Sequence, residues 1–274
     1  FHFFNGMVNL LAENGVSYLD ENGDEQTADN VTVVDGSTTA WSDGWYVVNR
    51  NVTIDSRVTV RGEVHLILAD NASLTVDGGI NVAEGKSFSV YAQSVGEKMG
   101  TLTATGENGA GIGGGSWENA GTITINGGSV TATGGYNQAG IGSGFEGSGG
   151  TVTISGGNVT ATGGQEAAGI GSVANGSYGN ITINGGTVKA TGGDYAAGIG
   201  GVAGVSYGNI TINGGNVTTT GGDYGAGIGG GQDSSGGNIT INGGNVTAIG
   251  GDLAAGIGGG FKSSGGTVTI SGGN

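Results

Sequence analysis

Side chains that could carry out chemistry are few in this sequence. Histidine occurs only at His2 and His65 and cysteine is absent, so neither a catalytic triad nor a zinc site is supported. Arginine occurs only at Arg50, Arg57 and Arg61. A polysaccharide lyase needs acids that hold calcium and a base that removes a proton beside a carboxylate, and so few basic residues argue against one. We therefore predict no catalytic residue and a protein that is not an enzyme.

Three aspartates, Asp194, Asp223 and Asp252, recur at one position where earlier copies of a repeat carry Gln165 and Tyr136. A stacked column places two carboxylates at the glycosidase separation of about 5–10 Å, but any repeat column does so by default. A solvated turn explains the column. The sharper alternative is a calcium ladder, because three carboxylates and nearby carbonyls would serve as ligands. We predict no required cofactor, with Ca²⁺ at these three aspartates as the one candidate.

Eight aromatic residues lie in two loop positions and could stack on sugar rings. They do not form an unbroken column, and this argues against a continuous polysaccharide groove. We take them as candidate contacts for a carbohydrate or another partner: Trp117, Tyr136, Phe145, Tyr178, Tyr195, Tyr207, Tyr224 and Phe261.

The motif Ala-Gly-Ile-Gly also recurs, and a strand that alternates would point only its glycines outward. Such a flat glycine strip could accept the chain's own following loop, which we favour, a neighbouring solenoid or a sugar polymer. Its members are Gly140, Gly142, Gly169, Gly171, Gly198, Gly200, Gly227 and Gly229.

Threonine pairs such as Thr131 and Thr133 form rows that look like the ice-binding faces of antifreeze solenoids. Lys189 interrupts these rows, and threonine is in any case a good outward residue in a strand. Ice binding is therefore kept only as a further alternative.

These candidates are spaced by a repeat of 29 residues. Copies begin at Gly121, Gly150, Gly179, Gly208 and Gly237, and a sixth begins at Gly266 and breaks off at Asn274, so we expect the chain to be part of a longer protein. Each copy holds three short runs of period two, such as 123–125, 130–133 and 139–142, bounded by Gly-Gly pairs suited to corners.

One copy buries too little apolar surface to fold alone, whereas stacked copies hydrogen-bond to one another in parallel sheets. The pattern predicts an all-β, right-handed parallel β-helix with three strands per 29-residue rung. Two thinner coils of 14–15 residues fit the three runs less well. Inward columns are expected to begin at Ile123 and Ile125, and an Asn/Ser ladder that begins at Asn126 is expected at the next corner.

Three regions follow from the spacing of the strands. Residues 1–45, with an apolar start and an acidic stretch, are predicted to form an N-terminal cap. Residues 46–99 alternate without the 29-residue period and are predicted to be irregular first rungs. Residues 100–274 are predicted to be the regular repeats.

Composition limits the possible partners. The net charge of −15 argues against nucleic-acid binding. The sequence contains no run of 18 apolar residues, so we predict no membrane insertion. Glycine supplies 68 of 274 residues without the collagen period, and the ordered Val, Ile and Thr runs do not fit a disordered chain.

The block VHLILADNASLTVDGGINVAEGKSFSVYAQS, followed by GTLTATG and the AGIGGG repeats, resembles a recurrent region in large surface proteins of gut Firmicutes. The resemblance spans roughly residues 45–274. It implies a pectate-lyase-like right-handed β-helix that is secreted or attached to the cell wall, with adhesion or carbohydrate binding as its role, and it transfers no catalytic residue.

The leading hypothesis is an extracellular bacterial surface scaffold, an adhesin stalk that presents a repetitive interaction surface. The rival is a carbohydrate-binding module, with or without calcium, and a self-assembling fibre subunit is a further alternative. The partners expected are a polysaccharide, another cell-surface protein, or a second copy stacked end to end.

Overall fold

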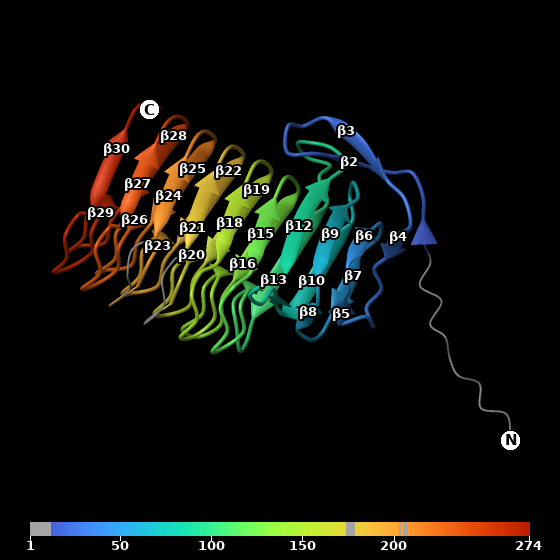
Figure 1. Cartoon of the computed structure of the whole chain (residues 1–274), viewed down its shortest axis with the longest axis horizontal. Helices are drawn as coiled ribbons and strands as arrows, with labels where there is room; N and C mark the ends of the chain where they lie inside the picture. Colours follow the sequence, from blue (N-terminus) through green and yellow to red (C-terminus); the bar gives the residue numbers. More distant parts are fainter. Residues whose placement is uncertain (1–11, 174–178, 203, 205–207) are drawn as a thin grey trace, which may run out of the picture.

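The computed structural model describes residues 12–173, 179–202, 204 and 208–274. The described chain contains strands and loops but no helix, and it winds as a right-handed parallel β-helix. Figure 1 shows the coils stacked in chain order, from the N-terminal strands in blue to the C-terminal strands in red. The predicted fold class is thereby confirmed. No helix in the described ranges is long and apolar enough to cross a membrane.

Three long sheets form the walls of the solenoid. The first sheet has the order β1 (Ala12–Glu13), β4 (Val31–Val33), β6 (Gly44–Val48), β9 (Glu63–Leu68), β12 (Ser87–Ala92), β15 (Thr122–Ile125), β18 (Thr151–Ile154), β21 (Asn180–Ile183), β24 (Asn209–Ile212), β27 (Asn238–Ile241) and β30 (Thr267–Ile270). The second sheet runs from β7 (Val52–Ile54) through β10 (Ser73–Gly78), β13 (Thr101–Gly106), β16 (Ser129–Thr133), β19 (Asn158–Thr162), β22 (Thr187–Thr191) and β25 (Asn216–Thr220) to β28 (Asn245–Ile249). The third sheet runs from β5 (Ala40–Trp41) through β8 (Val58–Val60), β11 (Ile80–Asn81), β14 (Ile112–Gly113), β17 (Ile141–Gly142), β20 (Ile170–Gly171), β23 (Ile199–Gly200) and β26 (Ile228–Gly229) to β29 (Ile257–Gly258).

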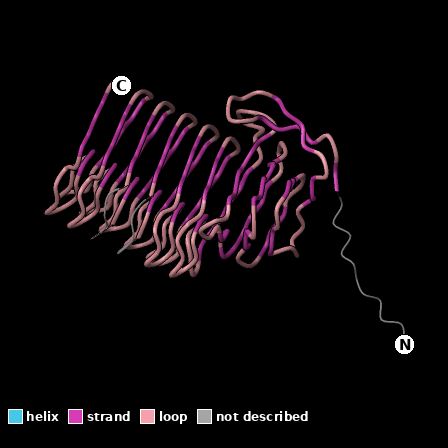
Figure 2. Tube along the Cα trace, viewed as in Figure 1, coloured by secondary structure: helices cyan, strands magenta, loops and turns pink. Residues whose placement is uncertain are grey.

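The repeat sets the register of all three sheets. Thr122 pairs with Thr151, Ser129 with Asn158 and Ile141 with Ile170, so each residue stacks on the one 29 positions later. Each rung therefore contributes one strand to each sheet, as the three runs predict. Figure 2 shows tight corners along one side of the solenoid and the longer loops gathered along the other.

The interior is filled by the inward residues of the stacked strands. The columns that begin at Ile123 and Ile125 are buried through Ile239 and Ile241, which confirms their assignment to the core. Val268 and Ile270 continue these columns in β30 but are 41% and 63% exposed, because no rung follows them in this sequence. The first rungs hold larger side chains, and the rings of Trp41 and Tyr46 stack there at 5.4 Å.

Three members of the predicted polar corner column form a hydrogen-bonded amide ladder, whereas the Oδ1 of Asn126, where the column begins, has no hydrogen-bond partner among the described residues. Asn213 Nδ2 donates to Asn184 Oδ1 at 2.9 Å, and Asn242 Nδ2 donates to Asn213 Oδ1 at 2.9 Å. A second ladder joins Asn180, Asn209 and Asn238. These bonds satisfy side-chain groups along the axis, so they stabilise the rungs without a ligand.

The first rungs are irregular in spacing. Along the first sheet Gly44 pairs with Val64, Glu63 with Ser87, and Ser87 with Thr122, which are offsets of 20, 24 and 35 residues. In this sheet the offset between paired residues is 29 only from β15 onward, where the exact repeat begins in the sequence.

The described part of the N-terminal region contains a hairpin of β2 (Val16–Leu19) and β3 (Glu25–Ala28). Val16 and Ala28 are buried against Val47 and Ile67 on the outer side of the first sheet, so the hairpin packs on a lateral wall. Figure 1 shows it beside β12. β4 and β5, although within residues 1–45, already pair with solenoid strands. Whether residues 1–45 act as a cap stays a prediction.

Candidate functional site

The eight glycines predicted to form a flat outer strip are all buried. A Cβ at Gly140 would lie 2.7 Å from both the Thr162 nitrogen and the Gly169 oxygen of the next rung. Gly142 has φ of +135°, and a Cβ there would overlap the carbonyl of Gly171. The prediction that these glycines point outward is therefore wrong. They are covered by the backbone of the next rung of the same chain, which agrees most closely with the favoured alternative of an intramolecular cover. The third strand does not alternate like an ordinary strand, and its missing side chains would point along the axis into the chain's own backbone.

The aspartate column lies in exposed turns. Asp194, Asp223 and Asp252 are exposed, and the turns stack through their backbones, with the Tyr224 N–H donating to the Asp194 carbonyl at 3.0 Å. Among the described residues, no group of three or more His, Cys, Asp or Glu side chains is placed to hold a metal ion. The column thus has the geometry of a solvated turn, and calcium binding there stays an untested prediction.

Removal of calcium is expected to leave the stability of the protein unchanged. Addition of a chelator to the purified chain should not shift its thermal unfolding midpoint, because the turn residues are held by backbone hydrogen bonds rather than by an ion. Differential scanning calorimetry with and without EDTA, and with added Ca²⁺, measures the effect. A midpoint that falls with chelator and recovers with Ca²⁺ would restore the calcium ladder.

The predicted aromatic residues divide into separate groups. The rings of Tyr195 and Tyr224 stack on each other at 5.3 Å and 11°, and Phe261 meets Tyr224 edge-on at 5.5 Å. Their faces therefore serve mainly as one another's partners. Tyr136 stands apart from these contacts and is 72% exposed. Tyr178 and Tyr207 lie outside the described residues.

Trp117 and Phe145 form the remaining group. Their rings meet edge to face at 5.2 Å, and Trp117 is still 69% exposed. A hollow of about 310 Å³ opens beside the indole, and its other lining residues are Ala83, Glu84, Glu118 and Asn119. Among the aromatic residues predicted as candidate contacts, Trp117 thus has an exposed ring beside a hollow that contains polar groups. We call this hollow the Trp117 hollow.

Arg57, one of the few bases that a lyase could use, is committed to the structure. Burial lowers its pKa to about 10, so the guanidinium remains charged at neutral pH. It donates hydrogen bonds to four backbone carbonyls, those of Gly78 (2.8 Å), Ala110 (3.0 Å), Gly113 (3.2 Å) and Gly114 (3.2 Å). A charged guanidinium cannot accept a proton, so Arg57 has no role as a base.

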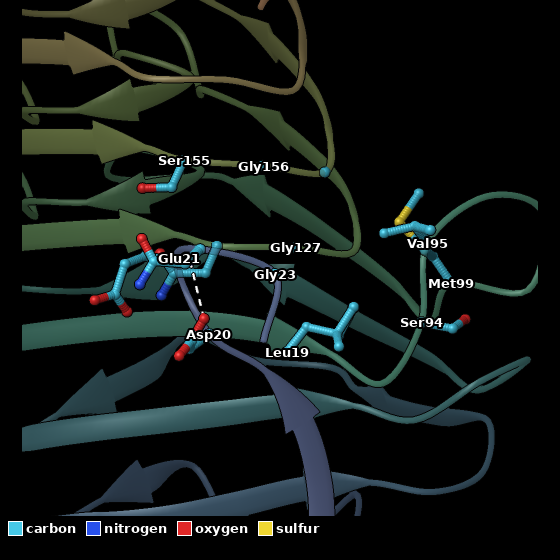
Figure 3. Close-up of a pocket in the computed structure, with 14 residues that line it drawn as sticks. Leu19, Asp20, Glu21, Gly23, Ser94, Val95, Met99, Gly127, Ser155 and Gly156 are labelled. Atoms are coloured by element: carbon cyan, nitrogen blue, oxygen red, sulfur yellow. Dashed lines mark hydrogen bonds between the residues drawn. The ribbon is translucent and has the colours of Figure 1, made fainter. Parts of the chain in front are cut away.

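A cavity of about 190 Å³ lies where the tip of the hairpin approaches the corner of the solenoid. Figure 3 shows Asp20 and Glu21 on one side of it and Val95 and Met99 on the other. Asp20 is occupied by the turn itself, since it accepts hydrogen bonds from the Asn22 and Asp24 backbones, and these bonds lower its pKa. Asn126 also lines the cavity, and its buried Oδ1 has no hydrogen-bond partner among the described residues.

Four rings form a cluster beneath the hairpin that sequence reasoning missed. Trp45 stacks on His65 at 4.5 Å, its ring lies tilted to that of Tyr18 at 4.7 Å, and burial raises the pKa of Tyr91 beside them. His65 also lies 3.4 Å from a Glu63 carboxylate oxygen. The ring contacts attach the hairpin to the first sheet. The alternation of residues 44–48 and 63–68 indicates which side chains point outward. It does not indicate that the β2–β3 hairpin covers them.

A model described as a beta helix repeat matches six segments of the chain, residues 100–116, 123–145, 152–177, 181–204, 210–232 and 239–261. Neither a comparison with curated proteins nor one with solved structures returned a match. The first matched segment begins directly before β13 of the second sheet, and each of the others begins in a strand of the first sheet, 29 residues after the one before it from residue 123 onward. Sequence match and stacked strands agree, and the chain is a β-helix repeat protein.

Proposed function

We propose that the chain is a non-enzymatic extracellular scaffold, of the adhesin-stalk type, that presents a repetitive interaction surface. The observation that supports this most is an unbroken outward column on the first sheet. It consists of Thr124, Thr153, Thr182, Thr211, Thr240 and Thr269, paired rung on rung. A stack with one repeated register gives a stiff rod whose surface groups recur at about 4.8 Å.

An extracellular location is part of the proposal and rests on the resemblance to bacterial surface proteins. The absence of cysteine suits an oxidising or a reducing compartment alike. Candidate partners are a polysaccharide, another cell-surface protein, or a second copy of the chain.

A carbohydrate-binding module is the second candidate. The exposed Trp117 beside a hollow with carboxylate and amide groups favours it, because ligand sites combine an aromatic surface with a few placed polar groups. This candidate does not need the repeated surface and draws on the irregular rungs instead.

A glycan array probed with the purified chain separates the two candidates. Silence across the array supports the scaffold, and specific micromolar binding supports the module. Incubation with the same polysaccharides tests whether the protein is an enzyme. New reducing ends or unsaturated sugar products would overturn a non-enzymatic role. Sedimentation velocity over a concentration series tests association of copies.

A further inference from the structure

Trp117 adopts an unusual backbone conformation. Its φ is +68°, in the left-handed region that bulky residues avoid at a cost of about 1–2 kcal/mol. The backbone N–H donates to the Phe145 carbonyl at 2.7 Å, and Phe145 packs edge to face with the indole. A strained main chain thus holds a large ring in the solvent, where the ring buries little surface of its own. The same loop position is left-handed at Glu146, Asp233 and Lys262, so this conformation belongs to the repeated loop, and the exposed indole is what sets Trp117 apart.

The polar groups of the Trp117 hollow are held in place by neighbouring rungs. Asn119 Nδ2 donates to Glu84 Oε2 at 3.0 Å, while Asn119 Oδ1 accepts from the Ser148 N–H at 2.9 Å. Glu118 Oε2 accepts from Asn81 Nδ2 at 3.1 Å. Each of the two carboxylates therefore has its Oε2 occupied, and its Oε1 has no hydrogen bond to any described residue. Both carboxylates line the hollow together with Trp117.

This combination favours a sugar unit as the ligand. The apolar face of a pyranose ring can lie on the indole, and its hydroxyls can donate to the open carboxylate oxygens. At about 310 Å³ the hollow is at the small end of ligand sites, which suits a single unit of a chain rather than a long stretch.

The charges of the hollow define the class of sugar. Glu84 and Glu118 are both exposed acids on a chain of net charge −15, so an anionic sugar would be repelled at close range. The hollow is also unsuited to hydrolysis, because a glycosidase places its general acid in apolar surroundings and these two carboxylates are exposed. A metal ion is not implied, since the described residues contain no group of three potential ligands.

We propose that the Trp117 hollow binds one unit of a neutral polysaccharide, with Trp117 as the stacking platform and Glu84 and Glu118 as hydroxyl acceptors. The proposal rests on the second candidate function, the carbohydrate-binding module, and gives that module a site and a ligand class.

Affinity electrophoresis of the whole chain tests the proposal, with gels that contain galactomannan, mixed-linkage β-glucan or polygalacturonate. The key variant is Trp117→Gly, because glycine removes the ring and also tolerates a φ of +68°, so folding is preserved. Asp233→Gly is the matched control, since Asp233 occupies the equivalent loop position four rungs later, is exposed with φ of +51° and lies outside the hollow. Thermal unfolding of each variant is measured alongside.

We expect retardation by at least one neutral polymer, a loss of affinity of tenfold or more in Trp117→Gly, and no change in Asp233→Gly. Retardation that survives Trp117→Gly would overturn this site but leave the module standing. Equal or tighter binding of polygalacturonate would overturn the neutral class. No retardation by any polymer would overturn the site, and with a silent glycan array it would remove the module as well.

Discussion

Replacement of Gly171 with alanine is expected to destabilise the protein by about 3–5 kcal/mol. Gly171 has φ of +140°, a conformation that side chains rarely adopt, and a Cβ there would overlap the Gly200 carbonyl of the next rung. The Gly200 oxygen cannot move away without breaking a hydrogen bond between the two rungs, because the N–H of Ser172 donates to it at 3.1 Å. Equilibrium unfolding in urea, followed by far-ultraviolet circular dichroism, measures the loss.

Gly265→Ala is the matched control. Gly265 is exposed, and no atom lies within 4 Å of the Cβ that alanine would add, so its stability should change by no more than about 0.5 kcal/mol. Because solenoid unfolding is not always two-state, both variants are compared by transition midpoint as well as by fitted free energy. A Gly171→Ala protein as stable as Gly265→Ala would show that the rungs can separate to admit side chains.

The register of the regular rungs could be predicted from sequence because it follows from arithmetic. A 29-residue period with three alternating runs places Ile123 on Val152 and Asn184 on Asn213, and the structure pairs or bonds them so. Burial of the isoleucine columns then follows from period-two alternation.

Alternation fails where the backbone leaves the strand region. In the regular rungs the third-sheet strands have only two residues, such as Ile141–Gly142, and Gly142 has a positive φ. A Cβ at Gly142 would therefore point along the axis into Gly171, and one at Gly140, just before the strand, would meet the backbone of the same next rung, where alternation predicted an outward strip. The recurrence of glycine indicates that these positions exclude a side chain. The sequence pattern does not show which neighbouring atoms leave no room for a Cβ.

The Trp117 hollow could be predicted only in part for a related reason. Trp117 stands out as an aromatic residue in a loop, yet Glu84 reaches it across a rung whose offset is about 35 residues rather than 29. No repeat links these positions, so their contact depends on the lengths of two irregular loops. The hairpin likewise lies on the lateral wall because it packs on Val47 and Ile67. Alternation identifies these two residues as outward-pointing, but it does not show that the hairpin packs on them.

Arg57→Met is expected to cost about 3 kcal/mol or more, although Arg57 belongs to no sheet. Its guanidinium fills the space beside Gly79 and Gly109 at the corner of the irregular rungs and serves four carbonyls that the uneven offsets bring together. Methionine would fill much of the volume but donate no hydrogen bond, so these carbonyls would lose a buried donor. The nearby Glu118 favours the charged form and partly offsets the effect of burial.

The pH dependence of this loss separates hydrogen bonding from a titration effect. Burial holds the pKa of Arg57 at about 10, below its ordinary value, so the folded and unfolded chains both keep the proton below pH 9. The stability difference between the wild-type protein and Arg57→Met should therefore be constant from pH 5 to about 9. Above about pH 10 the folded state would release the proton first, and deprotonation would then favour the folded wild-type protein.

Two further variants test whether the shape of the guanidinium matters. Arg57→Lys keeps the charge, but a single ammonium cannot reach four carbonyls in a fixed fork, so an intermediate loss is expected. Arg61→Met removes an exposed arginine that makes no ion pair within the described residues and should change stability by about 0.5 kcal/mol at most. Urea unfolding of the three variants at pH 7 gives the order of their stabilities. An Arg57→Met protein no less stable than Arg61→Met would mean that water or relaxed backbone donors satisfy the corner, and that the irregular rungs are stabilised by their apolar core alone.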